Sequence, residues 1–325
     1  MNQPSQTGNL TGPVLITGGA GFLGSNLAAR LCERGLGVRL LDNLARNSLP
    51  YMDNPALKKA ELIEGDITEA AICEKALAGV ETVVHMAAIA GVHNYYETPH
   101  RVMQVNIGGI LALLRAMESC SVRRLVFLSS SEVYGTHARD AKETDPLPVT
   151  EMKDMRWTYA VSKIAGEKAC LAFGNQTGIS VVILRPFNVF GPGQTGEGAV
   201  RDMIKTVLAK EPLTVHGDGS QVRAWCHVDD FVDAAVAALD HPDLSAEIFN
   251  VGNPDSSVTV AELAESIVRA VDYQVNIHNK PHFGTDIRYR TPNIDHAKRI
   301  LGFAPKITLE KGLKETVEWY RKHDA

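Results

Sequence analysis

Long apolar runs are missing from this chain of 325 residues. No stretch approaches the roughly 20 consecutive apolar residues that a helix needs to cross a bilayer. The first dozen residues are polar and lack the apolar centre of a signal peptide, so residues 1–12 are expected to form a flexible leader. These absences predict a cytoplasmic protein with no membrane partner.

Clustered metal ligands and clustered positive charge are missing as well. The cysteines are odd in number and widely spaced, with no CxxC pair or Cys/His cluster: Cys32, Cys73, Cys120, Cys170 and Cys226. This pattern argues against a disulfide framework or a zinc site and predicts reduced, buried thiols and no metal. The net charge is −5 and the basic residues are scattered, so no nucleic-acid partner is expected.

The chain does contain a regular alternation of short apolar runs and amphipathic stretches, from residue 13 to about residue 184. Such alternation is typical of βαβ units in an α/β protein with a parallel sheet. Six strands are predicted at 14–16, 38–41, 61–63, 82–84, 125–128 and 181–184, and helices at 21–34, 69–77, 99–119 and 158–173.

The regular pattern ends at Pro186, and glycine-rich loops follow at 191–193 and 196–198. Further helices are predicted at 199–210, 228–239, 259–271, 294–301 and 309–322. We therefore expect a cofactor-binding domain over 13–186 and a smaller, mixed α/β substrate lobe over 187–325. The helix at 228–239 is expected to pack back onto the sheet, so this boundary is approximate.

A glycine-rich motif, Thr17-Gly18-Gly19-Ala20-Gly21-Phe22-Leu23-Gly24, joins the first predicted strand to the first helix. Its glycines permit a tight turn close to a pyrophosphate, and the helix start presents free N–H groups, as in a Rossmann-type doubly wound sheet. Asp42 ends the second strand, where an acid meets the adenosine ribose and repels a 2′-phosphate, so NAD is predicted. Arg46 keeps NADP open, and Asp66 either approaches the adenine amine or is an ordinary turn aspartate.

Tyr159 and Lys163 lie four positions apart and therefore on one face of a predicted helix. An adjacent ammonium and a cationic nicotinamide favour the phenolate, which would make Tyr159 a usable base. A surface pair is the alternative. The run Ser129-Ser130-Ser131-Glu132 follows the fifth strand at its carboxyl end, where open α/β sheets bind ligands, although a capped turn would have the same composition.

Together these residues resemble the extended short-chain dehydrogenase/reductase family, and within it the nucleotide-sugar epimerases, dehydratases and decarboxylases. The resemblance extends over nearly the whole chain and includes His85-Met86-Ala87-Ala88, Asn106, Arg185-Pro186-Phe187-Asn188, the segment 217–223 and His227-Val228-Asp229-Asp230. It implies a sugar-nucleotide substrate, most simply a UDP-sugar, and a homodimer formed through the helices at 99–119 and 158–173.

The resemblance also implies a reaction cycle that begins with oxidation at C4 of the sugar. Tyr159 would take the hydroxyl proton, Ser130 would hydrogen-bond the same oxygen, and Lys163 would hold the nicotinamide ribose. Asn188 and Arg223 would contact the diphosphate, which suits guanidinium geometry; a surface arginine is the alternative for Arg223. The implied NAD site consists of Gly18, Gly21, Phe22, Leu23, Gly24, Asp42, Asn43, Asp66, Ile67, Ala87 and Lys163.

The three reactions of the resembling enzymes leave different signatures. Dehydratases usually carry Thr-Asp-Glu where this chain has Ser130-Ser131-Glu132, which places dehydration last. Uronate decarboxylases show the Ser-Glu pair, the segment 156–159 and the segment 290–294, and in them the residues matching Glu132 and Arg290 lie by the uronate carboxyl.

Ser131 is expected at the substrate too, and a surface arginine remains the alternative for Arg290. Ala90-Gly91-Val92-His93 looks more like the loop of 4-epimerases. UDP-glucuronate decarboxylation is therefore the first prediction and 4-epimerisation the second.

Two other classes of function compete with this prediction. A catalytically silent NAD-binding scaffold would usually have lost the tyrosine, lysine or serine, and all three are present here. A plain oxidoreductase that releases reduced cofactor would act on a small alcohol or ketone, whereas the segment 217–223 favours a substrate with a diphosphate.

Overall fold

A computed structural model describes residues 12–136, 138–148, 151–241, 243–281, 284–285 and 287–323. The predicted leader at 1–12 lies outside these residues except for Gly12. Within the described ranges, no helix combines the length and the apolar character needed to span a membrane.

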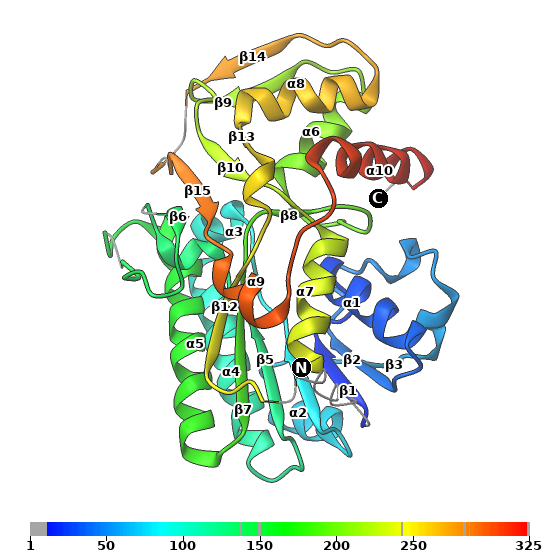
Figure 1. Ribbon diagram of the computed structural model, residues 1–325, viewed down its shortest axis with the longest axis vertical. Coiled ribbons are helices and arrows are strands. Elements are labelled where there is room, and N and C mark those ends of the chain that lie inside the picture. The colour runs from blue at the N-terminus through cyan, green and yellow to red at the C-terminus, as the bar shows by residue number, and fades with distance from the viewer. Residues whose placement is uncertain are drawn as a thin grey trace, which may run out of the picture.

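A seven-stranded, all-parallel sheet forms the centre of the molecule, with the strand order β12-β7-β5-β4-β1-β2-β3 (Figure 1). Its strands are β1 (Val14–Thr17), β2 (Val38–Asp42), β3 (Glu61–Glu64), β4 (Thr82–His85), β5 (Arg124–Leu128), β7 (Ser180–Pro186) and β12 (Glu247–Val251). The chain runs outward from β1 to β3 and then reverses at β4, which confirms the predicted doubly wound fold.

The prediction of six strands was wrong by one, because β12 joins the edge of this sheet beside β7. Its sequence, EIFNV, is short and lies among the helices of the second half of the chain. Parallel pairing with a strand more than sixty positions upstream leaves no local signal, so neither hydrophobic period nor turn residues identified it.

Alternate residues of each strand face two separate cores, as the two-residue period of a strand requires. On β1, Val14 and Ile16 join a core with α1 (Phe22–Glu33) and α7 (Val228–Asp240). Leu15 faces the opposite core, which is covered by α2 (Ala70–Leu77), α4 (Pro99–Met117) and α5 (Thr158–Thr177). Helices therefore cover both faces of the sheet (Figure 1). A ligand is expected instead at the polar edge formed by the carboxyl ends of the strands.

A smaller lobe lies beyond this edge and has its own core (Figure 1). It contains α6 (Ala199–Leu208), α8 (Val260–Val271), α10 (Leu309–Lys322) and the parallel pair β9 (Leu213–His216) and β14 (Ile277–Lys280). α9 (Asp295–Leu301) instead packs beside α7 in the core of the large sheet.

A four-stranded sheet of mixed direction connects the two halves of the chain, in the order β13-β10-β15-β6. Its strands are β13 (Ser257–Thr259), β10 (Val222–Ala224), β15 (Tyr289–Pro292) and β6 (Ala138–Ala141). A further short pair joins β8 (Val189–Phe190) to β11 (Cys226–His227). These pairings bring residues near 130, 223 and 290 to one place.

The cysteines are free thiols, and four of them are buried, as the sequence predicts. Cys120 is the exception, because it is only half-buried at the end of α4. Burial raises the pKa of the Cys73 thiol to about 11, which keeps it protonated and unreactive.

Candidate active site

The turn between β1 and α1 leaves room for a ligand only because of its glycines. Gly18 has φ +68°, and a Cβ there would lie 2.8 Å from the backbone nitrogen of Ala87. A Cβ on Gly24 would lie 2.3 Å from the carbonyl oxygen of Gly18. The turn, β4 and the first turn of α1 therefore approach one another as a dinucleotide cradle requires, and Gly21 caps α1 without a side chain in the way.

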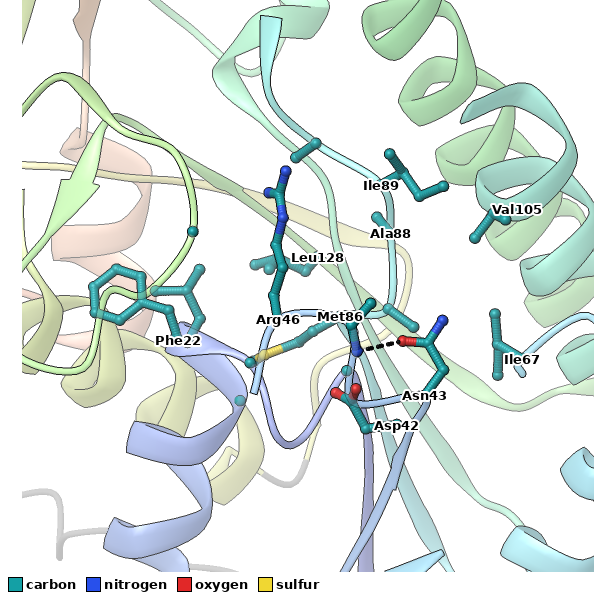
Figure 2. Close-up of a pocket in the computed structure, with 18 of the residues that line it drawn as sticks. Phe22, Asp42, Asn43, Arg46, Ile67, Met86, Ala88, Ile89, Val105 and Leu128 are labelled. Carbon is teal, nitrogen blue, oxygen red and sulfur yellow. Dashed lines mark hydrogen bonds between the residues drawn. The ribbon is translucent and has the colours of Figure 1, made fainter. Parts of the chain in front are cut away.

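Asp42 holds the loop that follows β2 and faces the same cavity (Figure 2). Its carboxylate accepts hydrogen bonds from the backbone N–H of Ala20, at 3.0 Å, and of Leu44, at 2.8 Å. Burial raises the pKa of Asp42, and these N–H groups oppose the shift. Arg46, the residue that kept NADP open, forms an ion pair of 3.3 Å with Glu197 on the far side of the cavity.

The cavity has a volume of about 570 Å³ and runs along the carboxyl edge of the sheet. Every residue that was predicted to bind NAD lines it: Gly18, Gly21, Phe22, Leu23, Gly24, Asp42, Asn43, Asp66, Ile67, Ala87 and Lys163. Figure 2 shows Phe22 on one side, Asp42 and Asn43 at the end of β2, and Ile67 on the opposite side. The residues present therefore fit a dinucleotide, since the glycine cradle and Tyr159 line the same cavity.

Asp66 makes the contacts of a turn aspartate and also lines the cavity, and its approach to an adenine amine stays a prediction. One oxygen accepts hydrogen bonds from the N–H and the hydroxyl of Thr68, as a turn aspartate does. The other pairs with Arg101 at 2.9 Å, and both acidic and basic side chains line the cavity. The loop residues Gln194 and Thr195 also line it, and sequence reasoning missed them, since only their neighbouring glycines marked this segment.

Tyr159 and Lys163 both line the cavity, and both are buried. Lys163 Nζ donates a hydrogen bond of 2.7 Å to the carbonyl oxygen of Leu128, and burial lowers the pKa of this lysine to about 8. Burial and the charge of Glu132 raise the pKa of Tyr159, while a hydrogen bond with Ser130 opposes them. The predicted lowering of the Tyr159 pKa is therefore not produced by the protein alone, because Lys163 points to Leu128.

Tyr95 packs flat against Tyr159, with ring centroids 5.3 Å apart and an angle of 11° between the planes. It lies on α3 (Val92–Glu97), a helix that the sequence analysis did not predict. The Gly91 N–H donates to the Tyr95 hydroxyl at 3.2 Å, which fixes the ring. The only available signal was the aromatic pair that follows the epimerase-like loop at 90–93.

Glu132 is the centre of a buried charge cluster. It accepts hydrogen bonds from Arg290 Nη1, at 2.6 Å, and from Arg156 Nη2, at 3.0 Å. Burial by itself would raise the pKa of Glu132, but the guanidinium groups of Arg290 and Arg156 outweigh it and lower the pKa to about 2. Arg290 is therefore no surface arginine, in contrast to the exposed Arg288.

Two guanidinium groups surround one carboxylate, so this cluster carries a net charge of +1. Its hydrogen bonding is incomplete as well. Among the described residues, three donors of the cluster, Arg156 Nη1 and Arg290 Nε and Nη2, and one acceptor, Glu132 Oε2, are buried without a hydrogen-bond partner. Unsatisfied buried donors are costly and uncommon, so the cluster has the properties of a site for an anion.

The serine run divides into structural and site residues. Ser129 is buried and donates to Glu167, so this hydroxyl of the predicted ligand-binding run serves the core instead. Ser130 is half-buried and accepts a hydrogen bond from the Glu132 N–H at 3.2 Å. Ser131 is buried beside them, in the short helical turn 131–134 that follows β5.

The predicted diphosphate residues lie on the small sheet and its approach. Asn188 has φ +38° and donates from Nδ2 to the carbonyl oxygen of Ala224 at 2.9 Å. Arg223 on β10 is the register partner of Arg290 on β15, so both side chains leave the same face of the sheet.

His227, Asp229 and Glu315 form another group of polar side chains, outside the cavity. His227 Nδ1 accepts a hydrogen bond from the Asp229 N–H and so caps α7. In the neutral ring the proton then lies on Nε2, which leaves no lone pair there for a metal. The group acts as a helix cap.

Known proteins with a similar sequence or structure include enzymes that act on UDP-sugars. Residues 14–252 match the NAD dependent epimerase/dehydratase family. UDP-N-acetyl-alpha-D-glucosaminuronate decarboxylase of Bacillus cytotoxicus is 32% identical over 317 residues, which cover 95% of this chain and 97% of that protein. UDP-glucuronic acid decarboxylase 1 of Arabidopsis thaliana is 32% identical over 318 residues, which cover 95% of this chain and 69% of that protein.

A crystal structure of UDP-glucuronic acid 4-epimerase from Bacillus cereus, in complex with UDP-glucuronic acid and NAD, superposes with a TM-score of 0.87. It is 26% identical, and the match covers 95% of this chain and 99% of that one. The enzyme class and the NAD cofactor predicted from the sequence are confirmed, and the chain belongs to the NAD dependent epimerase/dehydratase family.

Proposed function

We propose that this protein decarboxylates UDP-glucuronate through transient oxidation at C4 of the sugar. The observation that carries the proposal is the buried cluster of Glu132 with Arg156 and Arg290, whose net charge is +1 and whose outer N–H groups have no partner. A uronate carboxylate supplies the missing negative charge and acceptors. The hydroxymethyl group of a neutral hexose supplies no charge.

In this scheme Tyr159 takes the proton of the C4 hydroxyl, and Ser130 hydrogen-bonds the same oxygen. Tyr159 keeps its proton in the protein alone, because burial and Glu132 raise its pKa, so it becomes a base only when positive charge is placed beside its ring. NAD supplies that charge and the acceptor for the C4 hydride when it is bound. Lys163, held by the Leu128 carbonyl, is in place to bind the nicotinamide ribose.

Oxidation at C4 makes the uronate a β-keto acid, which explains why decarboxylation follows. The electron pair of the C5–C6 bond moves toward the C4 oxygen as carbon dioxide leaves, and that oxygen becomes an enolate. Tyr159, now protonated, and Ser130 donate hydrogen bonds to it, and a proton then adds at C5. Arg290 orients the carboxylate before this step, while the negative charge of Glu132 favours its departure as a neutral molecule.

The remaining predicted residues suit the nucleotide end of the substrate. In this scheme residues 13–186 bind NAD, and the lobe 187–325 contributes Asn188 and Arg223 to the diphosphate. Arg223 and Arg290 are neighbours across β10 and β15, so one face of the small sheet presents two cations to one dianionic diphosphate and one carboxylate. Ser131 is buried in the turn 131–134 that follows β5 and is proposed to contact the sugar.

A UDP-hexuronate 4-epimerase is the second candidate. The loop at 90–93 and the similarity to the Bacillus cereus 4-epimerase favour it, and Tyr159, Lys163 and the arginine cluster would serve an epimerase in the same way. The difference lies in the fate of the 4-keto uronate, which an epimerase returns with its carboxyl intact.

Proton NMR of the purified protein with UDP-glucuronate and catalytic NAD separates the two. Conversion of the anomeric and H5 signals to those of a UDP-pentose or its 4-keto form is the expected result. An epimeric uronate that keeps its carboxyl would make the protein a 4-epimerase. An unchanged spectrum with UDP-glucuronate would overturn the uronate proposal, and neutral UDP-, dTDP-, GDP- and CDP-hexoses would be tried next.

A further inference from the structure

Arg156 is the middle residue of a short helical turn, Met155–Trp157, directly before α5. The side chain is 7% exposed, and its guanidinium carbon is 5.7 Å from the centroid of Tyr95 and 5.5 Å from that of Trp157. The segment 156–159 resembles that of uronate decarboxylases, but no role for Arg156 was predicted from the sequence. Its position between two aromatic rings and Glu132 is a result of the tertiary structure.

We infer that Arg156 is a positioning residue that makes the site select a carboxylate over a neutral group at C5 of the sugar. The inference rests on the proposed function, in which the substrate is a UDP-hexuronate. It concerns selection among substrates that share the same nucleotide, and it does not depend on whether the keto intermediate is decarboxylated or epimerised.

The charge count of the cluster is the first argument. Glu132 and Arg290 alone would be a neutral pair, with hydrogen bonding between Oε1 and Nη1 at 2.6 Å. Arg156 adds a second cation on the same carboxylate, with its Nη2 2.9 Å from Oε2. Burying a charge is costly for the folded protein, and Glu132 is already paired with Arg290, so this second cation needs a functional explanation. An incoming anion provides one.

The way in which Arg156 is held is the second argument. Asp154 accepts a hydrogen bond from the Arg156 N–H at 2.9 Å, and Thr285 donates to the other Asp154 oxygen at 2.6 Å. The rings of Tyr95 and Trp157 pack against the guanidinium and restrict its movement. A long side chain fixed in this manner loses little further entropy when a ligand binds, which is what a preorganised binding site requires.

The third argument is the path from Arg156 to the reacting centre. The Tyr95 ring contacts the Arg156 guanidinium and also stacks on the ring of Tyr159. The cluster therefore lies beside the group that acts at C4, and C5, which carries the carboxyl group, is bonded directly to C4. Arg156 is not among the described residues that line the NAD cavity, so its guanidinium makes no direct contribution to that lining.

The test is a comparison of Kd values for UDP-glucuronate and UDP-glucose, measured by calorimetry on the NAD-loaded protein. A Tyr159→Phe background prevents turnover. In that background, Arg156→Gln lowers the cluster charge to 0, Glu132→Gln raises it to +2, and the double variant restores +1. The matched control is Arg139→Gln, an exposed arginine on β6 of the same small sheet.

The preference for UDP-glucuronate is expected to fall at least about tenfold in Arg156→Gln, because one unit charge near the carboxylate is removed in a poorly solvated site. The preference is expected to be maintained or increased in Glu132→Gln, to recover in the double variant, and to stay within about twofold in Arg139→Gln. Arg156→Lys keeps the charge and should retain most of the preference, and it serves as the readout if Arg156→Gln fails to fold.

Two different results would contradict the inference, and they are distinguishable. If the background protein prefers UDP-glucuronate and Arg156→Gln keeps that preference, Arg156 has no part in selection. If Arg156→Lys loses the preference as fully as Arg156→Gln does, packing rather than charge is responsible, which also overturns the inference. If the background protein shows no preference for the uronate, the proposed function itself fails.

Discussion

Arg290 Nη1 lies 2.6 Å from Glu132 Oε1, although 158 positions separate the two residues in the chain. The contact forms because β15 brings Arg290 beside β6, which follows the Glu132 turn directly. It joins the end of the small lobe to the carboxyl edge of the large sheet. The substrate-recognition part of the site therefore exists only when both halves of the chain have folded together.

Removing the proposed base should separate binding from chemistry. We expect Tyr159→Phe to lower turnover of UDP-glucuronate by about 100-fold to 10,000-fold, because the proton acceptor at C4 is lost. The Kd values for NAD and for the sugar nucleotide should stay within about threefold, since the buried ring remains stacked on Tyr95. Tyr273→Phe, at a tyrosine that is 42% exposed, is the control and should have near-normal turnover. Near-normal turnover of Tyr159→Phe itself would refute the assigned role.

Loss of Arg290 should harm only substrates that carry a carboxylate. We expect Arg290→Ala to weaken UDP-glucuronate binding by about 10-fold to 100-fold, the range for a charged hydrogen bond, with less than about threefold effect on UDP-glucose. Thermal unfolding should also show a loss of stability, because Glu132 keeps one partner instead of two. The exposed Arg288→Ala is the control. An equal loss with both sugar nucleotides would give Arg290 a structural role only.

Acid should destabilise the protein through Glu132. The pKa of this carboxyl is lowered from 4.5 to about 2 in the folded protein, by Arg290 and Arg156 acting against burial. A lowered pKa contributes stability above pH 4.5 that is lost as the pH falls toward 2, an effect of about 3 kcal/mol.

Urea unfolding between pH 2 and pH 6 measures this contribution by comparison with Glu132→Gln. The free energy of unfolding of the variant should depend less on pH in that range, because glutamine does not titrate. Identical pH dependence in the two proteins would show that the two arginines do not lower the pKa of Glu132 in solution.

The glycine cradle makes a prediction for cofactor binding. In Gly24→Ala the new Cβ would lie 2.3 Å from the Gly18 carbonyl oxygen, so the β1–α1 turn must move. We expect the affinity for NAD to fall by at least about tenfold, as the N–H groups of the turn leave their positions. Gly37→Ala is the control, because its new Cβ meets only Pro13 at an ordinary 3.5 Å. Unchanged NAD binding in Gly24→Ala would exclude this turn as the phosphate site.

Homodimer formation through α4 and α5 is a further prediction. Leu111 on α4 is 51% exposed, which is costly for an isolated chain and favourable in a helix bundle. Light scattering at micromolar concentration should give twice the chain mass, and Leu111→Asp should give the single chain. Ile277→Asp, on the distant β14, should leave the dimer intact. A monomeric wild-type protein would rule out the dimer.

The cofactor half of the site was readable from the sequence because its determinants are local. The glycines at 18–24 lie within one strand–turn–helix unit, and Tyr159 and Lys163 lie one helical turn apart, so spacing fixes their relative positions. Helix boundaries followed from the same local periodicity. The structure places Gly18, Gly21, Gly24, Tyr159 and Lys163 around one cavity.

The rest depended on contacts between distant segments. Tyr95 stacks on Tyr159, and Arg156 shares Glu132 with Arg290, but no local pattern distinguishes these residues from other aromatic and basic ones. β12 was missed for the same reason, since its only strong partner is a parallel strand far upstream.

The sequence by itself thus determined the fold class and the place of the NAD cradle. The tertiary structure decided which charges meet at the substrate, because ion pairing depends on distance in space and strand pairing alone sets that distance.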